Sequence, residues 1–253
     1  MIKPIYTIWL RDIKQALRRK ITIISHLGQP LLWMFLLGMG LRGSVDTGGW
    51  TGMEVDYLAF MLPGIIGMSI LFSSMRGGMR VIYDRKFGFL KEMMVAPIPR
   101  VSIVLGITLA SATISVLQGM LIILIATIIG VNLNLNFIPV ALLFIFLIGM
   151  TFTGLSVAIS TRIEDIFGFE GTHTFITLPL FLLSGALFPV TKLPEPLQII
   201  SYVNPLFYGV DGLRAALIGV SSMPIWLDLM IMILFCTGLI VLSAYLFNKC
   251  EGV

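Results

Sequence analysis

The sequence has few charges: only 12% of its 253 residues are Asp, Glu, Lys or Arg, whereas 57% are hydrophobic. A soluble domain carries about 25% charged residues, so this composition excludes an ordinary water-soluble protein. The chain has two cysteines, which are too few for a disulfide framework and do not indicate a metal site. Basic residues gather at the ends of apolar runs rather than in one patch, which argues against nucleic-acid binding.

Motifs for catalysis and nucleotide binding are missing too. The sequence has no G-x-x-x-x-G-K-[ST] loop to cradle nucleotide phosphates and no Ser-His-Asp or Cys-His set. His26 and His173 are interpreted as packed or interfacial residues. We therefore expect no enzymatic activity and no cofactor in this chain. We also expect no cleavable signal peptide, because the first 20 residues are too polar and the next apolar run is of full spanning length.

Six long apolar runs dominate the rest of the chain. Each is near or above the roughly 20 residues that a helix needs to cross a bilayer, and a backbone in lipid must satisfy its hydrogen bonds internally. The sequence therefore predicts an all-α polytopic membrane protein, with one transmembrane domain over residues 1–253. The predicted spans are Thr22–Leu41, Tyr57–Met79, Val101–Ile129, Phe137–Ser160, Thr172–Val190 and Ile225–Phe247.

Residues 1–20 predict an amphipathic helix in the headgroup layer, because apolar residues recur at three-to-four spacing among basic ones. The alternative is a basic segment that only fixes topology. Fourteen of the 17 Lys and Arg residues lie on the side of the N-terminus, in the N-terminal segment, the second and fourth connections and the tail. The positive-inside rule therefore predicts that both termini are cytoplasmic.

Residues 191–222 have an unusual mixture of prolines and apolar pieces. Pro194, Pro196 and Pro205 break the chain, yet the pieces PLQIISYV and PLFYGVDGLRAALIG are apolar. This mixture predicts two re-entrant helices in the outer leaflet, with proline in the first turn of each. The alternative is a long loop on the outer ends of the spans.

Residues 83–96 form a charged, amphipathic island between two apolar runs. Phe87, Leu90 and Met94 give it an apolar side, and Pro97 ends it. The pattern predicts a short helix parallel to the membrane, able to pass a push to two spans. The alternative is an ordinary basic loop. The charged side consists of Arg85, Lys86, Lys91 and Glu92.

This island resembles the signature of ABC-2 type transporter permeases, read as Asp84, Arg85, Phe87, Gly88, Leu90, Lys91, Glu92, Pro97 and Arg100. Lys86 departs from the pattern, since an acidic residue is expected there. A second similarity joins SGALFPVTKLP (Ser184–Pro194) to NPLFYGVDGLR (Asn204–Arg214). Within the family, the chain is most similar to drug-resistance and nodulation-type exporters.

The resemblance implies a half-size permease that pairs with itself or a close relative and with two ATP-binding-cassette subunits, which hold ATP and Mg. It also implies that the coupling helix is seated in the ATPase, at Asp84, Arg85, Phe87, Gly88, Leu90, Lys91 and Glu92. The expected substrates are amphipathic drugs, lipids or lipid-linked saccharides, moved outward by alternating access across a prokaryotic plasma membrane. We expect the re-entrant helices to form an outer lid at Phe188, Pro189, Asn204, Pro205, Tyr208, Asp211 and Arg214.

Two spans carry polar faces, which have two interpretations. They line a substrate pathway, or they pack helices together through small residues and hydrogen bonds of about 0.6 kcal/mol. The residues assigned to the pathway hypothesis are Thr108, Ser111, Ser115, Gln118, Thr153 and Ser156.

Two other functions remain as alternatives. A secondary, ion-coupled carrier needs buried ionisable residues or matched half-repeats with broken helices, and neither is visible in the sequence. Asp228 in particular is interpreted as an interfacial residue. A non-transporting membrane scaffold would use the charged island only for docking.

Overall fold

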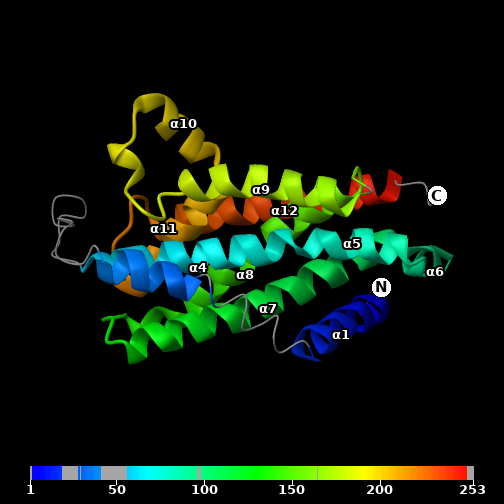
Figure 1. Ribbon diagram of the computed structural model, residues 1–253, viewed down its shortest axis with the longest axis horizontal. Coiled ribbons are helices and arrows are strands. Elements are labelled where there is room, and N and C mark those ends of the chain that lie inside the picture. The colour runs from blue at the N-terminus through cyan, green and yellow to red at the C-terminus, as the bar shows by residue number, and fades with distance from the viewer. Residues whose placement is uncertain are drawn as a thin grey trace.

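The computed structural model describes residues 2–18, 28, 30–40, 56–95, 98–163 and 165–249, without the side chains of Leu37, Met39, Lys91 and Met94. Within these ranges every regular element is a helix (Figure 1), which confirms the all-α prediction. Four of the described helical stretches are long and apolar enough to cross a membrane: Tyr57–Lys86, Arg100–Ile128, Leu135–Ser160 and Ile225–Lys249.

Helix α4 (Tyr57–Met75) lies at the centre of the bundle. It is apolar on all sides and almost wholly buried, as expected of a helix surrounded by protein. The Asp56 carboxylate caps its start by accepting a hydrogen bond from the Leu58 amide. Arg76 separates α4 from α5 (Gly77–Lys86), which continues in the same direction in Figure 1. The second span therefore extends past its predicted end at Met79.

Three further long helices complete the bundle: α7 and α8 pack against α4 and α5, and α12 packs against α7, α8 and α11. Helix α8 packs against α4, α5, α7, α11 and α12, and most of its residues are buried. Helix α12 is mostly exposed, as suits a helix that faces lipid. These helices match the third, fourth and sixth predicted spans to within about two residues. Their bounds are α7 Arg100–Ile128, α8 Ile138–Ser160, preceded by the 3-10 turn η2 Leu135–Phe137, and α12 Ile225–Lys249.

The other two predicted spans are less well matched. Helix α9 (Ile166–Leu182) has 17 residues, begins before the predicted Thr172 and ends before the predicted Val190. The chain turns after Leu182 because Gly185 adopts a left-handed φ of 71°. The first predicted span lies partly outside the described residues; residues 30–40 are helical and include the π-helical turn η1 (Met34–Met39). The count of six spans therefore stays a prediction.

The proline-rich segment does contain two short helices, α10 (Glu195–Val203) and α11 (Pro205–Ile218), after the 3-10 turn η3 (Val190–Lys192). Helix α11 is buried against α4, α8 and α12, whereas α10 is largely exposed and projects from the bundle (Figure 1). Their depth in a bilayer stays a prediction.

The two ends of the bundle carry different elements. Both termini and α6 (Phe89–Val95) lie at one end in Figure 1, and α10 and α11 lie toward the other. Helix α1 (Ile2–Arg18) packs along α7 near the first end. This arrangement agrees with the grouping of the basic residues. The side of the membrane that each end faces stays a prediction.

Candidate functional site

The predicted coupling segment consists of two helices rather than one. Helix α5 ends at Lys86, α6 begins at Phe89, and Gly88 between them has a φ of 77°. This left-handed conformation is strained for residues with a Cβ, so glycine fits it best. The break changes the predicted faces: Phe87, placed on the apolar side by helical periodicity, is 81% exposed, whereas Leu90 is buried.

The inner side of α6 forms a second, smaller hydrophobic core. Leu90 and Met93 pack against residues of five other helices, α1, α5, α7, α8 and α12. Full burial of one such side chain contributes about 1.5–3 kcal/mol of stability. Helix α6 is therefore fixed to the spans through packing. Its partners in this core are Ile8, Val81, Ile103, Val104, Ile107, Val157 and Phe247.

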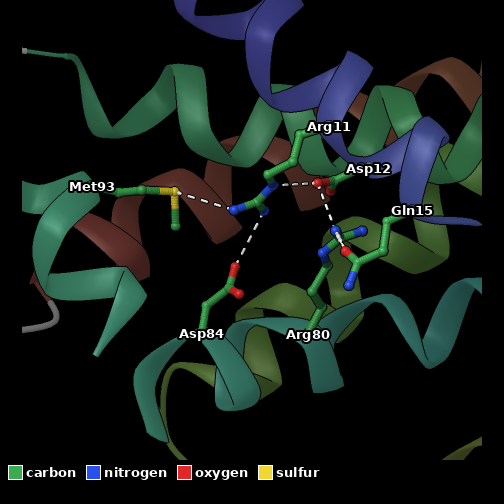
Figure 2. A network of polar contacts seen from close by, with 6 residues as sticks. All are labelled: Arg11, Asp12, Gln15, Arg80, Asp84 and Met93. Carbon is green, nitrogen blue, oxygen red and sulfur yellow. Dashed lines mark hydrogen bonds and ion pairs between the residues drawn. The ribbon is translucent and has the colours of Figure 1, made fainter. Parts of the chain in front are cut away.

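A polar network beside this core joins α1 to α5 and α6 (Figure 2). The Arg11 guanidinium donates to Asp12 at 2.8 Å and to Asp84 at 3.2 Å. It also lies 3.9 Å from the Met93 sulfur and 4.9 Å from the centre of the Phe89 ring. One arginine of the N-terminal helix therefore contacts the end of α5 and two turns of α6.

Asp12 is the centre of the same network. Its side chain is only 2% exposed and also forms an ion pair with Arg80 of α5, at 2.9 Å. Arg80 donates as well to the side-chain amide oxygen (Oε1) of Gln15 (Figure 2). Burial raises the pKa of the Asp12 carboxyl, although Arg80 and Arg11 oppose the shift. Burial acts against the charged form of Arg11, but Asp12 and Asp84 outweigh it and raise the Arg11 pKa.

Helix α1 is also fastened to α7. The Trp9 indole donates to the Thr113 hydroxyl at 3.1 Å, and Ile8 packs directly on Gly106. A push on α6 therefore meets a rigid unit of α1, α5 and α7.

The sequence interpretation missed the role of Asp12, because it treated residues 1–20 only as a membrane-surface helix. One signal was present: Asp12 is the single acidic residue among the first 20. It lies one turn after Ile8, so both residues share a face of the helix. The structure buries both.

The outward side of this end presents a mixed surface, here called the coupling surface and defined by Tyr83, Lys86, Phe87, Glu92 and Val95. All five side chains are exposed, and Val95 is 87% exposed. The Phe87 ring stacks on Tyr83, with centroids 6.3 Å apart. Of the predicted coupling residues, Asp84 and Leu90 thus face inward and Phe87 and Glu92 face outward. Arg85 is half-buried, and the Lys91 side chain lies outside the described part of the structure.

At the opposite end, predicted lid residues hold α11 in place. The Asn204 amide donates to the Leu180 carbonyl at 2.6 Å, and its oxygen accepts from the Leu206 amide, so Asn204 caps α11. Pro205 occupies the first turn of the helix, and the Tyr208 hydroxyl donates to the Tyr202 carbonyl at 2.7 Å. Phe188 and Pro189 lie half-buried in the turn before η3.

Asp211 and Arg214 join α11 to its neighbours. Asp211 accepts hydrogen bonds from the Ser222 and Met223 amides at 2.8–3.0 Å, in the turn before α12. Arg214 lies 3.8 Å from Asp211, donates to the Gly185 carbonyl at 2.8 Å and covers the Phe60 ring at 4.1 Å. These contacts brace the turn after α9 against α4 and α11.

Asp228 differs from its interpretation as an interfacial residue. Its side chain is 0% exposed, and neither carboxylate oxygen has a hydrogen-bond partner. The sequence suggested water contact because Asp228 lies near the end of a span. In the fold, α11 packs against α12 and helps to exclude water from the carboxylate.

The polar residues of the pathway hypothesis lie between helices of a single protomer. Gln118 donates to Ser69 at 2.8 Å, and Thr153 donates to Ser111 at 2.7 Å. Ser156 donates to the Met75 carbonyl and accepts from the Gly78 amide. These bonds tie α7 to α4, α8 to α7, and α8 to α4 and α5, so the helix-packing interpretation accounts for them in this conformation. Ser115 likewise contacts Ser74 at 3.4 Å, and Thr108 bonds to the Val104 carbonyl of its own helix.

Comparison with known proteins places this architecture in one family. Residues 3–218 match the family described as ABC-2 type transporter. The chain is 31% identical over 215 residues to ycf38 of Cyanophora paradoxa, described as a transport permease, covering 84% of this chain and 73% of that protein. It is 28% identical to nodulation protein J of Rhizobium leguminosarum bv. trifolii, over 78% and 74% of the two chains. It is 24% identical to the inner membrane transport permease YadH of Escherichia coli K12, over 98% and 95%.

The family match covers α1, the break at Gly88, the long helices α4 to α8, α9 and α11, and it therefore includes both ends of the bundle described above. The chain belongs to the ABC-2 type transporter family, as a membrane permease of an ABC transporter.

Proposed function

We propose that this chain is the membrane-spanning subunit of an ATP-driven exporter, in which the coupling surface binds a separate ABC ATPase. Two ATPase subunits and a second permease protomer, identical or closely related, complete the transporter. ATP binding closes the ATPase pair, moves α6 and rocks the spans between inward- and outward-facing states. The substrate is an amphipathic drug, a lipid or a lipid-linked saccharide.

The observation that carries the proposal is the attachment of α6. Its outer side is exposed, while its inner side is held by apolar packing and by the Arg11 network. A force applied to Phe87 or Glu92 therefore reaches α1, α5 and α7 together. A simple docking site needs no such attachment, and this favours a mechanical role over a non-transporting scaffold.

Helix α1 supports a membrane-surface position for the same end. Its exposed apolar residues Ile2, Tyr6 and Leu17 follow helical spacing along one stripe. Lys3, Lys14 and Arg18 are exposed beside them. A helix with this division lies in the headgroup layer, and basic residues at this end favour the cytoplasmic side. We place the coupling surface on the cytoplasmic side of the membrane on this ground, and the prokaryotic plasma membrane follows from the family resemblance.

The carrier alternative gains one observation, the buried Asp228 carboxylate. One carboxylate at one end of a bundle is not a relay across the membrane, and ion-coupled carriers hold their sites near the bilayer midplane. We therefore keep the ATP-driven exporter as the proposed function.

The test is reconstitution with the ABC ATPase encoded next to this chain. We expect the two proteins to co-purify and the pair to export a substrate from the drug, lipid or lipid-linked saccharide classes only with ATP. Arg85→Glu and Glu92→Lys are expected to abolish export and ATPase stimulation while membrane insertion stays normal. The control is Asp165→Asn, at the exposed N-cap of α9, where the asparagine oxygen can still accept from the Gly168 amide. Unchanged export by both reversal variants, or export driven by an ion gradient without ATP, contradicts the proposal.

A further inference from the structure

Asp228 is an acidic residue whose buried side chain has no hydrogen-bond partner. It lies in the first turn of α12, with its side chain 0% exposed. Neither carboxylate oxygen accepts a hydrogen bond. Burying an ionised carboxylate without a partner costs far more than burying a neutral one, so such a group neutralises or finds a counter-charge.

No described cation provides that counter-charge. Helix α12 packs against α7, α8 and α11. Helix α8 contains no titratable residue, and the only one in α7 is Arg100, at its first position and at the coupling end. On α11 the titratable residues are Tyr208, Asp211 and Arg214. On α12 the nearest is Cys236, two turns further along the helix.

The neighbours on α11 make ionisation harder rather than easier. Asp211 on the adjoining helix α11 is a carboxylate as well, and a second negative charge disfavours ionisation of the first. Arg214 is committed elsewhere: it is paired with Asp211, donates to Gly185 and lies over the Phe60 ring. The positive charge of Arg214 therefore offsets the negative charge of Asp211, and it does not serve as the counter-charge of Asp228.

The size of the available space decides which ligand can neutralise Asp228. Both oxygens have almost no surface that a water-sized sphere can reach. A hydrated cation, the amine of a substrate or a basic group of a second protomer cannot reach them without rearrangement. A proton needs no added space. Binding of the proton removes the negative charge and turns one carboxylate oxygen into a hydroxyl group.

We infer that Asp228 is a proton-binding site, protonated at neutral pH while α11 packs on α12 and ionised only when the two helices separate and admit water. The inference does not depend on the proposed function. It assigns to the end of the bundle opposite the coupling surface a chemical task that the coupling surface does not perform.

The test is magnetic resonance of the chain labelled with [4-13C]aspartate and reconstituted in lipid, because the carboxyl carbon reports its own protonation and needs no reagent access. The Asp228 signal is assigned by its loss in Asp228→Asn. At neutral pH we expect it at the position of a protonated acid. An ordinary aspartate, with a pKa of about 3.9, is protonated in only about one molecule in a thousand there. The exposed side chain of Asp165 provides the internal reference signal for an aspartate in contact with water.

An Asp228 signal at the ionised position at neutral pH overturns the inference. If Asp228→Asn does not fold, Asp228→Glu gives the same assignment, because it also removes the labelled carboxyl. A second measurement follows the melting temperature with pH. The folded chain retains a proton that the unfolded chain loses above about pH 4, so wild-type stability falls as pH rises. The melting temperature of Asp228→Asn relative to wild type is therefore expected to increase with pH. A difference that does not change with pH contradicts the inference.

Discussion

The attachment of α1 to α5 through Asp12 gives the most specific prediction. Asp12→Asn preserves the shape of the side chain but removes the charge that accepts from Arg11 at 2.8 Å and pairs with Arg80 at 2.9 Å. A hydrogen bond to a charged group contributes about 1.5–3 kcal/mol. The arginine side chains are 27% and 24% exposed, so water recovers part of that loss. We expect a loss of about 2–3 kcal/mol in the free energy of unfolding.

A double-mutant cycle with Arg80→Gln isolates the pair from other effects of each change. We expect a coupling energy of about 1–2 kcal/mol, measured by unfolding in mixed micelles. Lys14→Gln, on the exposed side of the same helix, is the control and is expected to change stability by less than about 0.5 kcal/mol. Single-mutant effects that add to within about 0.5 kcal/mol refute the reasoning, because they show that Asp12 and Arg80 act independently.

Three further predictions concern backbone and packing. Gly88→Ala is expected to lower the free energy of unfolding by about 1–2 kcal/mol and to reduce ATPase stimulation, because residue 88 has a φ of 77°. The control is Gly171→Ala, at a helical position with open space around it. Equal effects of the two variants contradict the role assigned to the left-handed conformation of Gly88. Gly212→Ala is expected to cost about 1–3 kcal/mol, since its Cβ meets the Phe144 ring, and Phe144→Leu is expected to recover part of the loss in a thermal unfolding assay. Arg214→Met is expected to lower stability by about 3 kcal/mol, because it leaves buried Asp211 without its cation; an unchanged melting temperature contradicts this.

Local hydrophobic pattern was sufficient to predict the long helices. The runs that became α4, α7, α8 and α12 are longer than any strand, and their ends were found to within a few residues except where α5 continues α4. Helix α9 was misplaced because Gly185 turns the chain while the composition stays apolar. Pattern alone does not register such a turn.

Contacts between distant segments were harder to predict. Asp12 and Arg80 are far apart in the sequence, and nothing local to either residue identifies the other as its partner. Phe87 was assigned to the wrong face because helical periodicity assumes an unbroken helix through Gly88. Asp228 was assigned to the interface because its burial depends on the packing of α11. For Asp12 and Asp228 tertiary placement decided the outcome, and for Phe87 the local backbone conformation of Gly88 decided it.

The central claim is that the ATPase engages the coupling surface rather than another part of the permease. Site-specific photo-crosslinking tests it directly, with a photoreactive amino acid at Phe87, which is 81% exposed in the coupling surface, or at Trp226, which is 62% exposed in the first turn of α12. The account predicts a crosslink from position 87 to the ABC ATPase and none from position 226. Crosslinking from position 226, or none from position 87 in an assembled complex that hydrolyses ATP, contradicts it.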